Sequence, residues 1–341
     1  MQNILVINGS HGEGGGQILR SSLALSLVTG TPFRLTDIRA GRSKPGLMRQ
    51  HLTAVQAAAA IGGAEVEGAV VGSQEITFHP GRVEGGDYTF AIGTAGSATL
   101  VLQTILPALL TAKERSTLVL EGGTHNPFAP PFDYIGRVFL PVLRRMGARI
   151  DISLERYGFY PAGGGRFTAH IEPVERLQPL YISERGRAVK RTVRAVVAHL
   201  PASIAQRELA IVKAKFPWPE ESFLIEEVHN SRGPGNIVFV ELEHEHITEM
   251  ITAFGEVGVP AESVAAEAAK QVRQYLISTA PVGICLADQI LLPFAMAGRG
   301  SFRALPLSRH ALTNIDIIRQ FLPVRIEAEP GRNECTVTVE E

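Results

Sequence analysis

Residues 4–20 read Ile4-Leu-Val-Ile-Asn-Gly-Ser-His-Gly-Glu-Gly-Gly-Gly-Gln-Ile-Leu-Arg20. The apolar run at the start predicts a strand over 3–8, and the amphipathic segment at the end opens a predicted helix over 17–29. The glycines between them let the backbone approach a ligand, and the free N–H groups of a helix N-terminus attract anions. The segment therefore predicts an α/β fold with an anion-binding loop between its first strand and first helix.

The same alternation of strands and helices recurs twice further along the chain. The first unit continues with strand 32–39, helix 46–61, and strands 64–70 and 75–80. The second comprises strand 87–92, loop 93–97, helix 98–111, strand 116–121, helix 131–146, and strands 149–154 and 166–172. The third comprises strand 178–183, helix 286–298, strand 300–305, helix 309–320, and strands 323–328 and 334–339. Each unit has the order β-α-β-α-β-β, so the sequence predicts a large domain of three repeats.

The third repeat is interrupted by a segment that is poor in glycine. Residues 187–278 contain four of the 34 glycines in 92 positions, and such a step in composition indicates a separate unit. We therefore expect a large catalytic domain formed by 1–184 and 280–341, and a small α/β domain inserted over 185–279. Within the insert the pattern predicts helices 203–215 and 261–277 and strands 222–228 and 236–243. Its ten basic and twelve acidic residues over 187–278 give no sign of RNA binding.

Composition excludes several classes of protein. With 33 basic and 34 acidic residues the net charge is −1, so any polyanion must bind at a local patch rather than a uniformly basic surface. Cys285 and Cys335 have neither metal nor redox spacing, and the N-terminus lacks the features of an export signal; both point to the cytoplasm. Residues 88–112 are uncharged, but their polar residues, glycines and Pro107 predict a buried strand, loop and helix rather than a membrane span.

The first glycine-rich loop has two chemical interpretations. It lacks the lysine of a Walker motif, and although Gly12 and Gly14 with Asp37 downstream resemble a dinucleotide fingerprint, Asp37 has strand spacing within 34–39. In that arrangement Glu13 would also direct a carboxylate at a pyrophosphate. Glu13 is better suited to bind Mg²⁺ or Mn²⁺ beside a nucleotide phosphate, and the alternative is a carboxylate that caps the following helix.

Basic residues are concentrated between positions 20 and 49. The acidic residue Asp37 stands alone there among Arg20, Arg34, Arg39, Arg42, Lys44 and Arg49. Arginine binds phosphate through two parallel hydrogen bonds, and Arg39 and Arg42 flank Gly41 at the end of a predicted strand. The stretch therefore predicts a phosphate site, with a solvated charged surface as the alternative.

His310 is the most informative of the ten histidines. It follows Ser308, a plausible N-cap, and so belongs to the first turn of a predicted helix. The positive end of that helix favours the neutral imidazole and attracts an anionic phosphate. His310 could therefore attack phosphorus and hold a phosphoramidate, whereas a surface or packed histidine is the alternative.

Three further polar motifs leave their roles open. His244 and His246 alternate on a predicted strand, which allows a metal site or a solvated edge strand. Asp288 and Gln289 open a predicted helix, and Gln103 lies within an apolar one. A buried glutamine must satisfy its amide either within the core or by contact with a ligand.

Taken together, these motifs resemble those of the RNA 3′-terminal phosphate cyclase family over essentially the whole chain. The segments that carry the resemblance are Gly12-Glu-Gly-Gly-Gly-Gln-Ile-Leu-Arg20, Arg39-Ala-Gly-Arg-Ser-Lys-Pro-Gly-Leu-Met-Arg-Gln-His51, Phe159-Tyr-Pro-Ala-Gly-Gly-Gly165 and Leu286-Ala-Asp-Gln289. The resemblance implies that His310, within Ser308-Arg-His-Ala-Leu-Thr-Asn314, is the histidine that this family adenylates. The family fold consists of three β-α-β-α-β-β repeats with a small inserted domain, and its core is similar to that of the enolpyruvyl transferases.

The resemblance implies an ATP-dependent ligase that acts on RNA carrying a 3′-terminal phosphate. His310 would take AMP from ATP and release pyrophosphate; AMP would pass to the RNA 3′-phosphate, and the neighbouring 2′-hydroxyl would displace it to close a 2′,3′-cyclic phosphate. By the same resemblance Glu13 would hold the divalent metal, Mg²⁺ or Mn²⁺. The phosphate and RNA end would be lined by Arg20, Arg39, Arg42, Gln50 and His51, and ATP would contact Gln103, Cys285, Leu286, Ala287, Asp288 and Gln289.

One departure from the family pattern concerns Cys285, which stands where a tyrosine can stack on adenine in relatives. Aromatic stacking contributes about 1–3 kcal/mol, so the departure bears on ATP affinity or selectivity. Two other classes compete with the cyclase: a non-catalytic, cyclase-like factor of ribosome assembly, which lacks the histidine at position 310, and an enolpyruvyl transferase. Neither a membrane nor an obligate protein partner is expected.

Overall fold

Residues 4–341, which the computed structural model describes, form four sheets of four strands each. The first sheet contains, in order, β1 (Leu5–Asn8), β2 (Phe33–Thr36), β4 (Ile76–His79) and β3 (Glu65–Glu67). β1 and β2 run parallel, whereas β4 is antiparallel to β2 and to β3. Asn3, which the sequence placed at the start of the first strand, lies outside the described residues.

Two further sheets repeat this topology. The second contains β5 (Asp87–Ala91), β6 (Ser116–Gly122), β8 (Gly165–Glu172) and β7 (Arg149–Arg156), and the third contains β9 (Leu180–Ile182), β14 (Arg299–Ala304), β16 (Cys335–Glu340) and β15 (Arg325–Pro330). In both sheets the first pair of strands is parallel and the other two pairs are antiparallel. The predicted α/β class with three β-α-β-α-β-β units is confirmed.

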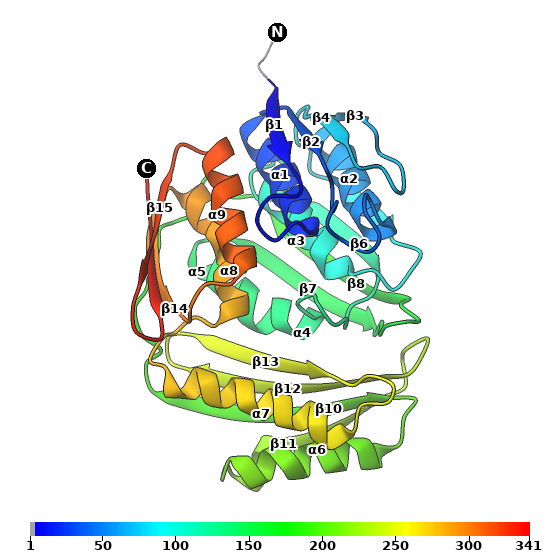
Figure 1. Ribbon diagram of the computed structural model, residues 1–341, viewed down its shortest axis with the longest axis vertical. Helices are drawn as coiled ribbons and strands as arrows, with labels where there is room; N and C mark the ends of the chain where they lie inside the picture. Colours follow the sequence, from blue (N-terminus) through cyan, green and yellow to red (C-terminus); the bar gives the residue numbers. More distant parts are fainter. Residues whose placement is uncertain (1–3) are drawn as a thin grey trace.

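The helices of the three repeats meet between the sheets (Figure 1). They are α1 (Gly16–Thr29), α2 (Arg49–Gly62), α3 (Ala98–Leu109), α8 (Ile284–Ala297) and α9 (Arg309–Phe321). Helix α1 packs against α2, α3 and α9, and α8 packs against α9. The single helix expected over 131–146 consists of α4 (Phe132–Tyr134), a π-helical turn η1 (Ile135–Phe139) and α5 (Leu140–Arg145).

The second strand is shorter than the expected 32–39. β2 ends at Thr36 because Asp37 and Arg39 have φ of 52° and 55°, a left-handed conformation that a strand does not contain. The chain turns there, and the N–H of Gly46 donates to the carbonyl of Ile38 at 2.8 Å. This turn carries Arg39 and Arg42 away from the sheet, into the loop that precedes α2.

The inserted segment forms the fourth sheet and two helices, drawn at the bottom of Figure 1. Its elements are β10 (Ala188–Ala198), α6 (Ala202–Lys215), the 3₁₀ turn η2 (Glu220–Ser222), β11 (Phe223–Val228), β12 (Gly235–His244), β13 (Thr248–Phe254) and α7 (Ala261–Ile277). The sheet order is β11-β10-β12-β13. The boundaries expected at 185 and 279 fall in the β9–β10 and α7–α8 connections, and the division into two domains stays a prediction.

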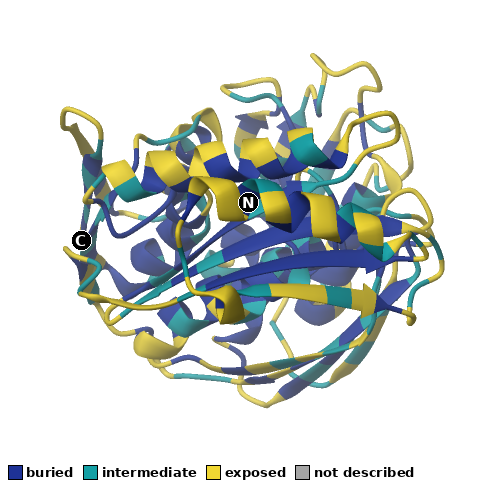
Figure 2. Cartoon of the chain, turned by 90° about the horizontal axis from the view of Figure 1, so that it is seen from below, coloured by how far each residue is buried: buried dark blue, intermediate teal, exposed yellow. Residues whose placement is uncertain are grey.

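The expectation of two strands in the insert was wrong, because β10 and β13 were missed. Both are buried on both faces over most of their length: in β10, Val193 packs with the insert's own helices whereas Val196 joins the core of the three repeats. A strand of this kind lacks the alternation of polar and apolar residues that identifies a half-buried strand, although β12, which is also buried on both faces, was predicted. Figure 2 shows the contrast, since exposed and buried residues alternate along the outer helices while the strands behind them are largely buried.

None of the helices within residues 4–341 has both the length and the apolarity to cross a membrane. The uncharged stretch 88–112 forms most of β5, a loop and α3, as expected.

Candidate active site

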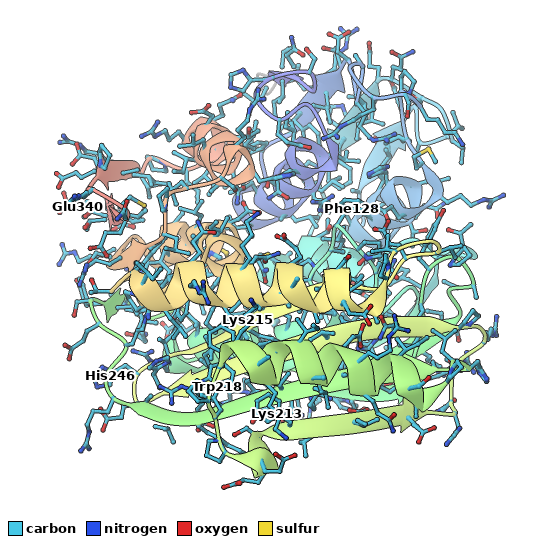
Figure 3. The ribbon with its side chains drawn as sticks, turned by 60° about the horizontal axis from the view of Figure 1, so that its bottom comes forward. Phe128, Lys213, Lys215, Trp218, His246 and Glu340 are labelled. Carbon is cyan, nitrogen blue, oxygen red and sulfur yellow. The ribbon has the colours of Figure 1, made fainter. Side chains whose placement is uncertain are left out.

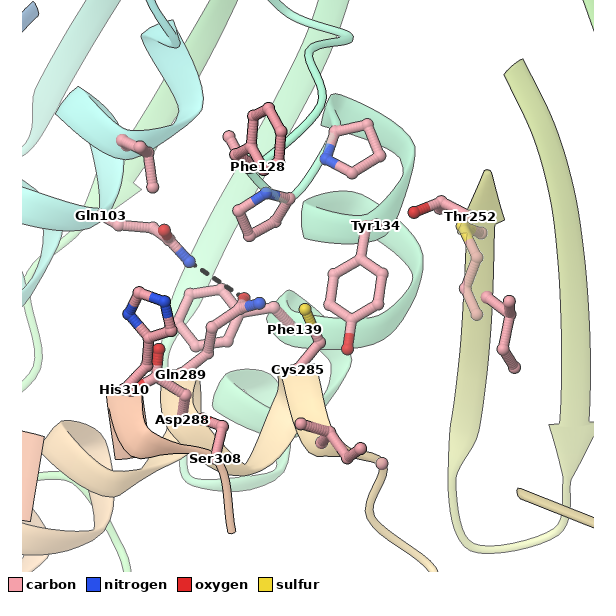
Figure 4. Close-up of a pocket in the computed structure, with 18 of the residues that line it drawn as sticks. Gln103, Phe128, Tyr134, Phe139, Thr252, Cys285, Asp288, Gln289, Ser308 and His310 are labelled. Carbon is pink, nitrogen blue, oxygen red and sulfur yellow. Dashed lines mark hydrogen bonds between the residues drawn. The ribbon is translucent and has the colours of Figure 1, made fainter. Parts of the chain in front are cut away.

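A cavity of about 990 Å³ opens between the helices of the repeats and the insert (Figure 4). One side is formed by α1, α3, α8 and the start of α9, and the other by β13 and α7 of the insert. The polar side chains from the repeats that reach it include Gln17, Arg20, Ser21, Gln103, Tyr134, Asp288, Gln289, Ser308, His310 and Asn314. Residues from all three repeats and from the insert therefore meet at one place.

His310 lies in the first turn of α9, as predicted. The side chain of Ser308 caps this helix by accepting a hydrogen bond from the N–H of Ala311 at 3.1 Å. The imidazole is 52% exposed. Partial burial lowers the pKa of His310, Arg20 and Arg42 add to this effect, and Asp288 opposes it. His310 is consequently neutral at neutral pH, the state in which an imidazole is a nucleophile.

Glu13 lies next to His310. The N–H of Glu13 donates to Oγ1 of Thr313 at 3.0 Å, which fixes the glycine-rich loop against α9. Its Oε1 is paired with the guanidinium of Arg42, and its Oε2 lies 3.7 Å from Nδ1 of His310. Within residues 4–341 this buried Oε2 has no hydrogen-bond partner. A hard cation held by one protein carboxylate and by substrate phosphates fits such an oxygen.

Arg20 and His51 form a second cluster over the backbone of Gly16. Burial lowers the pKa of Arg20 to about 10, which still leaves the guanidinium charged at neutral pH. Burial, followed by the charges of Arg20 and Arg39, lowers the pKa of His51 to about 3. Because Nδ1 of His51 accepts from the N–H of Met48 at 3.1 Å, its proton is on Nε2. The cluster therefore offers a cation and a neutral donor, which together suit a phosphate.

Arg39 and Gln50 organise the backbone around these groups. Nη1 of Arg39 donates to the carbonyls of Lys44 and Gly46, at 2.6 and 2.8 Å, and so holds its own loop. Oε1 of Gln50 accepts from the N–H of Ser97 at 3.0 Å, next to the start of α3. Both residues lie near the site, and the contacts they make in this structure are with the protein itself.

Asp288, Gln289 and Gln103 bring α8 and α3 together at the cavity. Nε2 of Gln103 donates to Oε1 of Gln289 at 2.9 Å, so one hydrogen bond joins the two amides, which face the cavity (Figure 4). Burial raises the pKa of Asp288, against the opposing charges of His310 and Arg20. Asn314 of α9 donates to Asp288, so the carboxylate is fixed beside His310.

Of the five residues from 285 to 289 that were expected to contact ATP, three line the cavity and two do not. Cys285, Asp288 and Gln289 line the cavity, whereas the side chains of Leu286 and Ala287 are buried in the core. The reason is the helical period of α8, which turns positions 286 and 287 away from 285, 288 and 289. Cys285 is exposed at the cavity; desolvation by the surrounding protein, followed by the charges of Glu249 and Asp288, raises the pKa of its thiol to about 12, so the thiol is neutral.

The sequence patterns missed one buried carboxylate of the cavity wall. Glu249 of β13 accepts from the hydroxyl of Tyr134 at 3.1 Å and from the N–H groups of Met250 and Gly283, at 3.0 and 2.7 Å. It thereby joins the insert to the N-terminus of α8. Burial raises its pKa to about 7. A glutamate within the apolar run of β13 was the available signal, but the strand itself was not predicted.

The pair His244 and His246 forms no metal site in the described part of the chain. His244 ends β12 and His246 lies in the following turn. Nowhere in residues 4–341 do three or more His, Cys, Asp or Glu side chains form a group that could hold a metal ion. Any ion at Glu13 would therefore take further ligands from substrate or water.

A histidine at a helix start, with the Glu13 carboxylate beside it and Arg20 at the same cavity, is an arrangement that suits an enzyme of phosphoryl or nucleotidyl transfer. Residues 11–328 match the family model of RNA 3′-terminal phosphate cyclase. A protein of Koribacter versatilis (strain Ellin345), named RNA 3′-terminal phosphate cyclase, is 54% identical over 99% of this chain and 95% of its own length. A protein of Ralstonia nicotianae (strain ATCC BAA-1114 / GMI1000) with the same name is 52% identical over 98% of this chain and 96% of its own.

The chain belongs to the RNA 3′-terminal phosphate cyclase family, and it is an enzyme of the cyclase class. The family predicted from the motifs is thereby confirmed. The individual roles assigned to the site residues stay predictions.

Proposed function

We propose that this enzyme uses ATP to convert the 3′-terminal phosphate of RNA to a 2′,3′-cyclic phosphate through a histidine–AMP intermediate. The observation that carries the proposal is the position of His310, a neutral imidazole beside the Glu13 carboxylate at a cavity of about 990 Å³. A cavity of this volume accommodates a nucleotide. The thiols of Cys285 and Cys335 are both free, as suits the reducing cytoplasm that we propose as the compartment.

In the first step His310 attacks the α-phosphorus of ATP. Nδ1 is the ring nitrogen nearer to Glu13, at 3.7 Å, and a proton on that atom leaves the lone pair of Nε2 for the attack. A bond forms between nitrogen and phosphorus, and the bond from the α-phosphorus to the bridging oxygen breaks to release pyrophosphate. The amides of Gln103 and Gln289 face the same cavity and would contact the nucleotide.

In the later steps AMP passes to an oxygen of the RNA 3′-phosphate, and the 2′-hydroxyl displaces it. The first transfer breaks the nitrogen–phosphorus bond and regenerates His310. The second joins the 2′-oxygen to the terminal phosphorus, releases AMP and gives up the hydroxyl proton. Arg20 and His51, which lie together over Gly16, would bind the RNA phosphate and hold it for in-line attack.

The divalent metal of the proposal would be held by Glu13. Its Oε2 is buried and, within residues 4–341, has no hydrogen-bond partner, which fits a ligand atom. When bound, Mg²⁺ or Mn²⁺ neutralises charge on nucleotide phosphates. Arg42, which pairs with the other oxygen, orients this carboxylate.

The experiment that tests the function follows the end of the substrate. An oligoribonucleotide labelled in its 3′-phosphate is incubated with enzyme, ATP and Mg²⁺, and then with phosphatase. We expect the label to become resistant to phosphatase and to become sensitive again after acid opens the cyclic phosphate. RNA with a 3′-hydroxyl is expected to remain unchanged.

Two variants provide the controls. His310→Ala is expected to abolish the resistant product, whereas His170→Ala, an exposed histidine on β8, retains it. A resistant end made equally well by His310→Ala, or made without ATP, would contradict the proposed chemistry.

A further inference from the structure

Phe128 is an exposed aromatic side chain at the cavity. The residue is 100% exposed, and it lines the same cavity as Cys285, Gln289 and His310. Figure 4 shows its ring on the loop that precedes α4, beyond Gln103 as seen from His310. Figure 3 places it apart from Lys213, Lys215 and Trp218, which lie on the insert. A phenyl ring in water contributes nothing to the core, so packing does not explain its position.

The backbone at Phe128 is strained. Its φ is 66°, a left-handed conformation that is unfavourable for a bulky residue and that glycine adopts without cost. Such strain persists where the surroundings enforce it, and it gathers at functional sites. The residue thus combines an unfavourable backbone with a ring that gains nothing from burial.

The loop that holds Phe128 is anchored on both sides. Asn126 is bonded to the carbonyl of Ala95, and Oγ1 of Thr99 donates to the carbonyl of Pro130 at 2.7 Å. The prolines at positions 127, 130 and 131 fix their own φ angles. The ring is therefore presented from a rigid loop, as a preorganised binding surface requires.

The other aromatic side chains of the cavity do not offer a free ring. Tyr134 is 2% exposed, Phe139 4% and Tyr275 1%, and Phe254 is partly buried. Among the described residues that line the cavity, Phe128 is thus the aromatic residue whose two faces are open to a planar ligand.

We propose that Phe128 is a stacking platform for a nucleobase at this site. The inference rests on the proposed function, which brings two nucleobases to the cavity: the adenine of ATP and the terminal base of the RNA. Every base has a flat π-face, so stacking on a phenyl ring gives affinity with little selectivity among bases. The ring supplies an aromatic surface that Cys285 does not.

The test measures equilibrium binding by calorimetry for the whole chain and three variants. Phe128→Ala removes the ring, Phe128→Leu keeps apolar bulk without a π-face, and Phe128→Trp keeps an aromatic face. All three have a Cβ, so the strain at φ of 66° is the same in each. One arm titrates ATP, and the other titrates a short oligoribonucleotide with a 3′-phosphate.

The expected result is a dissociation constant raised by roughly five- to hundredfold for Phe128→Ala and Phe128→Leu in one arm, with Phe128→Trp close to the wild type. The affected arm identifies which base stacks. A Phe128→Gly variant, which relieves the strain, should melt at a higher temperature than Phe128→Ala and bind as weakly.

Unchanged dissociation constants in both arms for Phe128→Ala would overturn the proposal. So would a loss in Phe128→Ala that Phe128→Leu fully restores, because apolar bulk would then suffice. A wild type that binds nucleotide but forms no cyclic end contradicts the proposed function alone, and the comparison of dissociation constants still decides the stacking. A wild type that binds neither ligand overturns both.

Discussion

Gly16 shows how a single residue shapes the proposed phosphate site. A Cβ at this position would lie 2.5 Å from Nε2 of His51 and 2.8 Å from Nη1 of Arg20. The two side chains can therefore close over the start of α1 only because residue 16 has no side chain. This requirement concerns close approach, since Gly16 is helical.

We expect Gly16→Ala to displace Arg20 and His51 and to lower cyclisation by roughly ten- to a hundredfold, since misplaced phosphate-binding groups cost about that much. The Michaelis constant for RNA should rise, as steady-state kinetics with varied RNA would show. Gly41→Ala is the matched control, because a Cβ there meets nothing within 4 Å. Equal activity of the two variants would show that the cluster over Gly16 does not bind substrate.

The sequence predicted features of single residues that depend on their neighbours along the chain. It did not predict contacts between residues that are far apart in the sequence. The N-cap at Ser308 follows from its type and position, and the structure confirms it. The contact of Glu13 with His310 joins residues nearly 300 positions apart, and no local pattern encodes it. That Glu13 and His310 belong to the same site was expected from the family resemblance. Phe128 was missed because an isolated phenylalanine between prolines carries no periodic signal.

Among the helices and strands, those with one buried face were easier to predict from the sequence than strands buried on both faces. Amphipathic helices such as α7 and alternating strands such as β8 were predicted nearly to the residue. β10 and β13, each of which packs one face on the insert's helices and the other on the repeats, were missed, whereas β12, which packs in the same way, was predicted. Helical period likewise explains why Leu286 and Ala287 are absent from the cavity although their neighbours line it.

Glu208 gives α6 a dependence of stability on pH. It is buried, its Oε2 accepts from Nδ2 of Asn236 at 2.9 Å, and its Oε1 has no partner within residues 4–341. Burial raises the pKa of Glu208 from its ordinary 4.5 to about 7. The folded state thus retains the proton between these values, and stability decreases as pH rises through that window.

A Glu208→Gln variant should not lose stability in this way as the pH rises, because glutamine does not ionise. We expect its free energy of unfolding, relative to the wild type, to increase by about 1–3 kcal/mol between pH 5 and pH 8. Thermal or urea unfolding across that range measures the difference. Glu262→Gln is the control, because the hydrogen bond from Arg207 lowers the pKa of Glu262 and removes it from the window. If the difference in free energy of unfolding between Glu208→Gln and the wild type is the same at every pH from 5 to 8, Glu208 is ionised in the folded protein over that whole range.

At the scale of the whole molecule, the repeat count was predictable because each repeat has its own strand and helix periodicity. The three sheets share one topology, and their helices meet around the cavity. What the sequence did not predict is the contribution of the insert, whose β13 and α7 complete the cavity wall. That packing involves faces buried between two parts of the chain, which no segment read alone reveals.

If His310 carries AMP during the reaction, mass spectrometry of the protein after incubation with ATP and Mg²⁺ will detect the adduct. We expect one AMP per chain, bound in an acid-labile, base-stable linkage on the peptide that contains His310, and discharged by RNA with a 3′-phosphate. His170→Ala should acquire the same adduct, and His310→Ala none. An AMP group on a different residue, or on His310→Ala, would show that His310 is not the nucleophile.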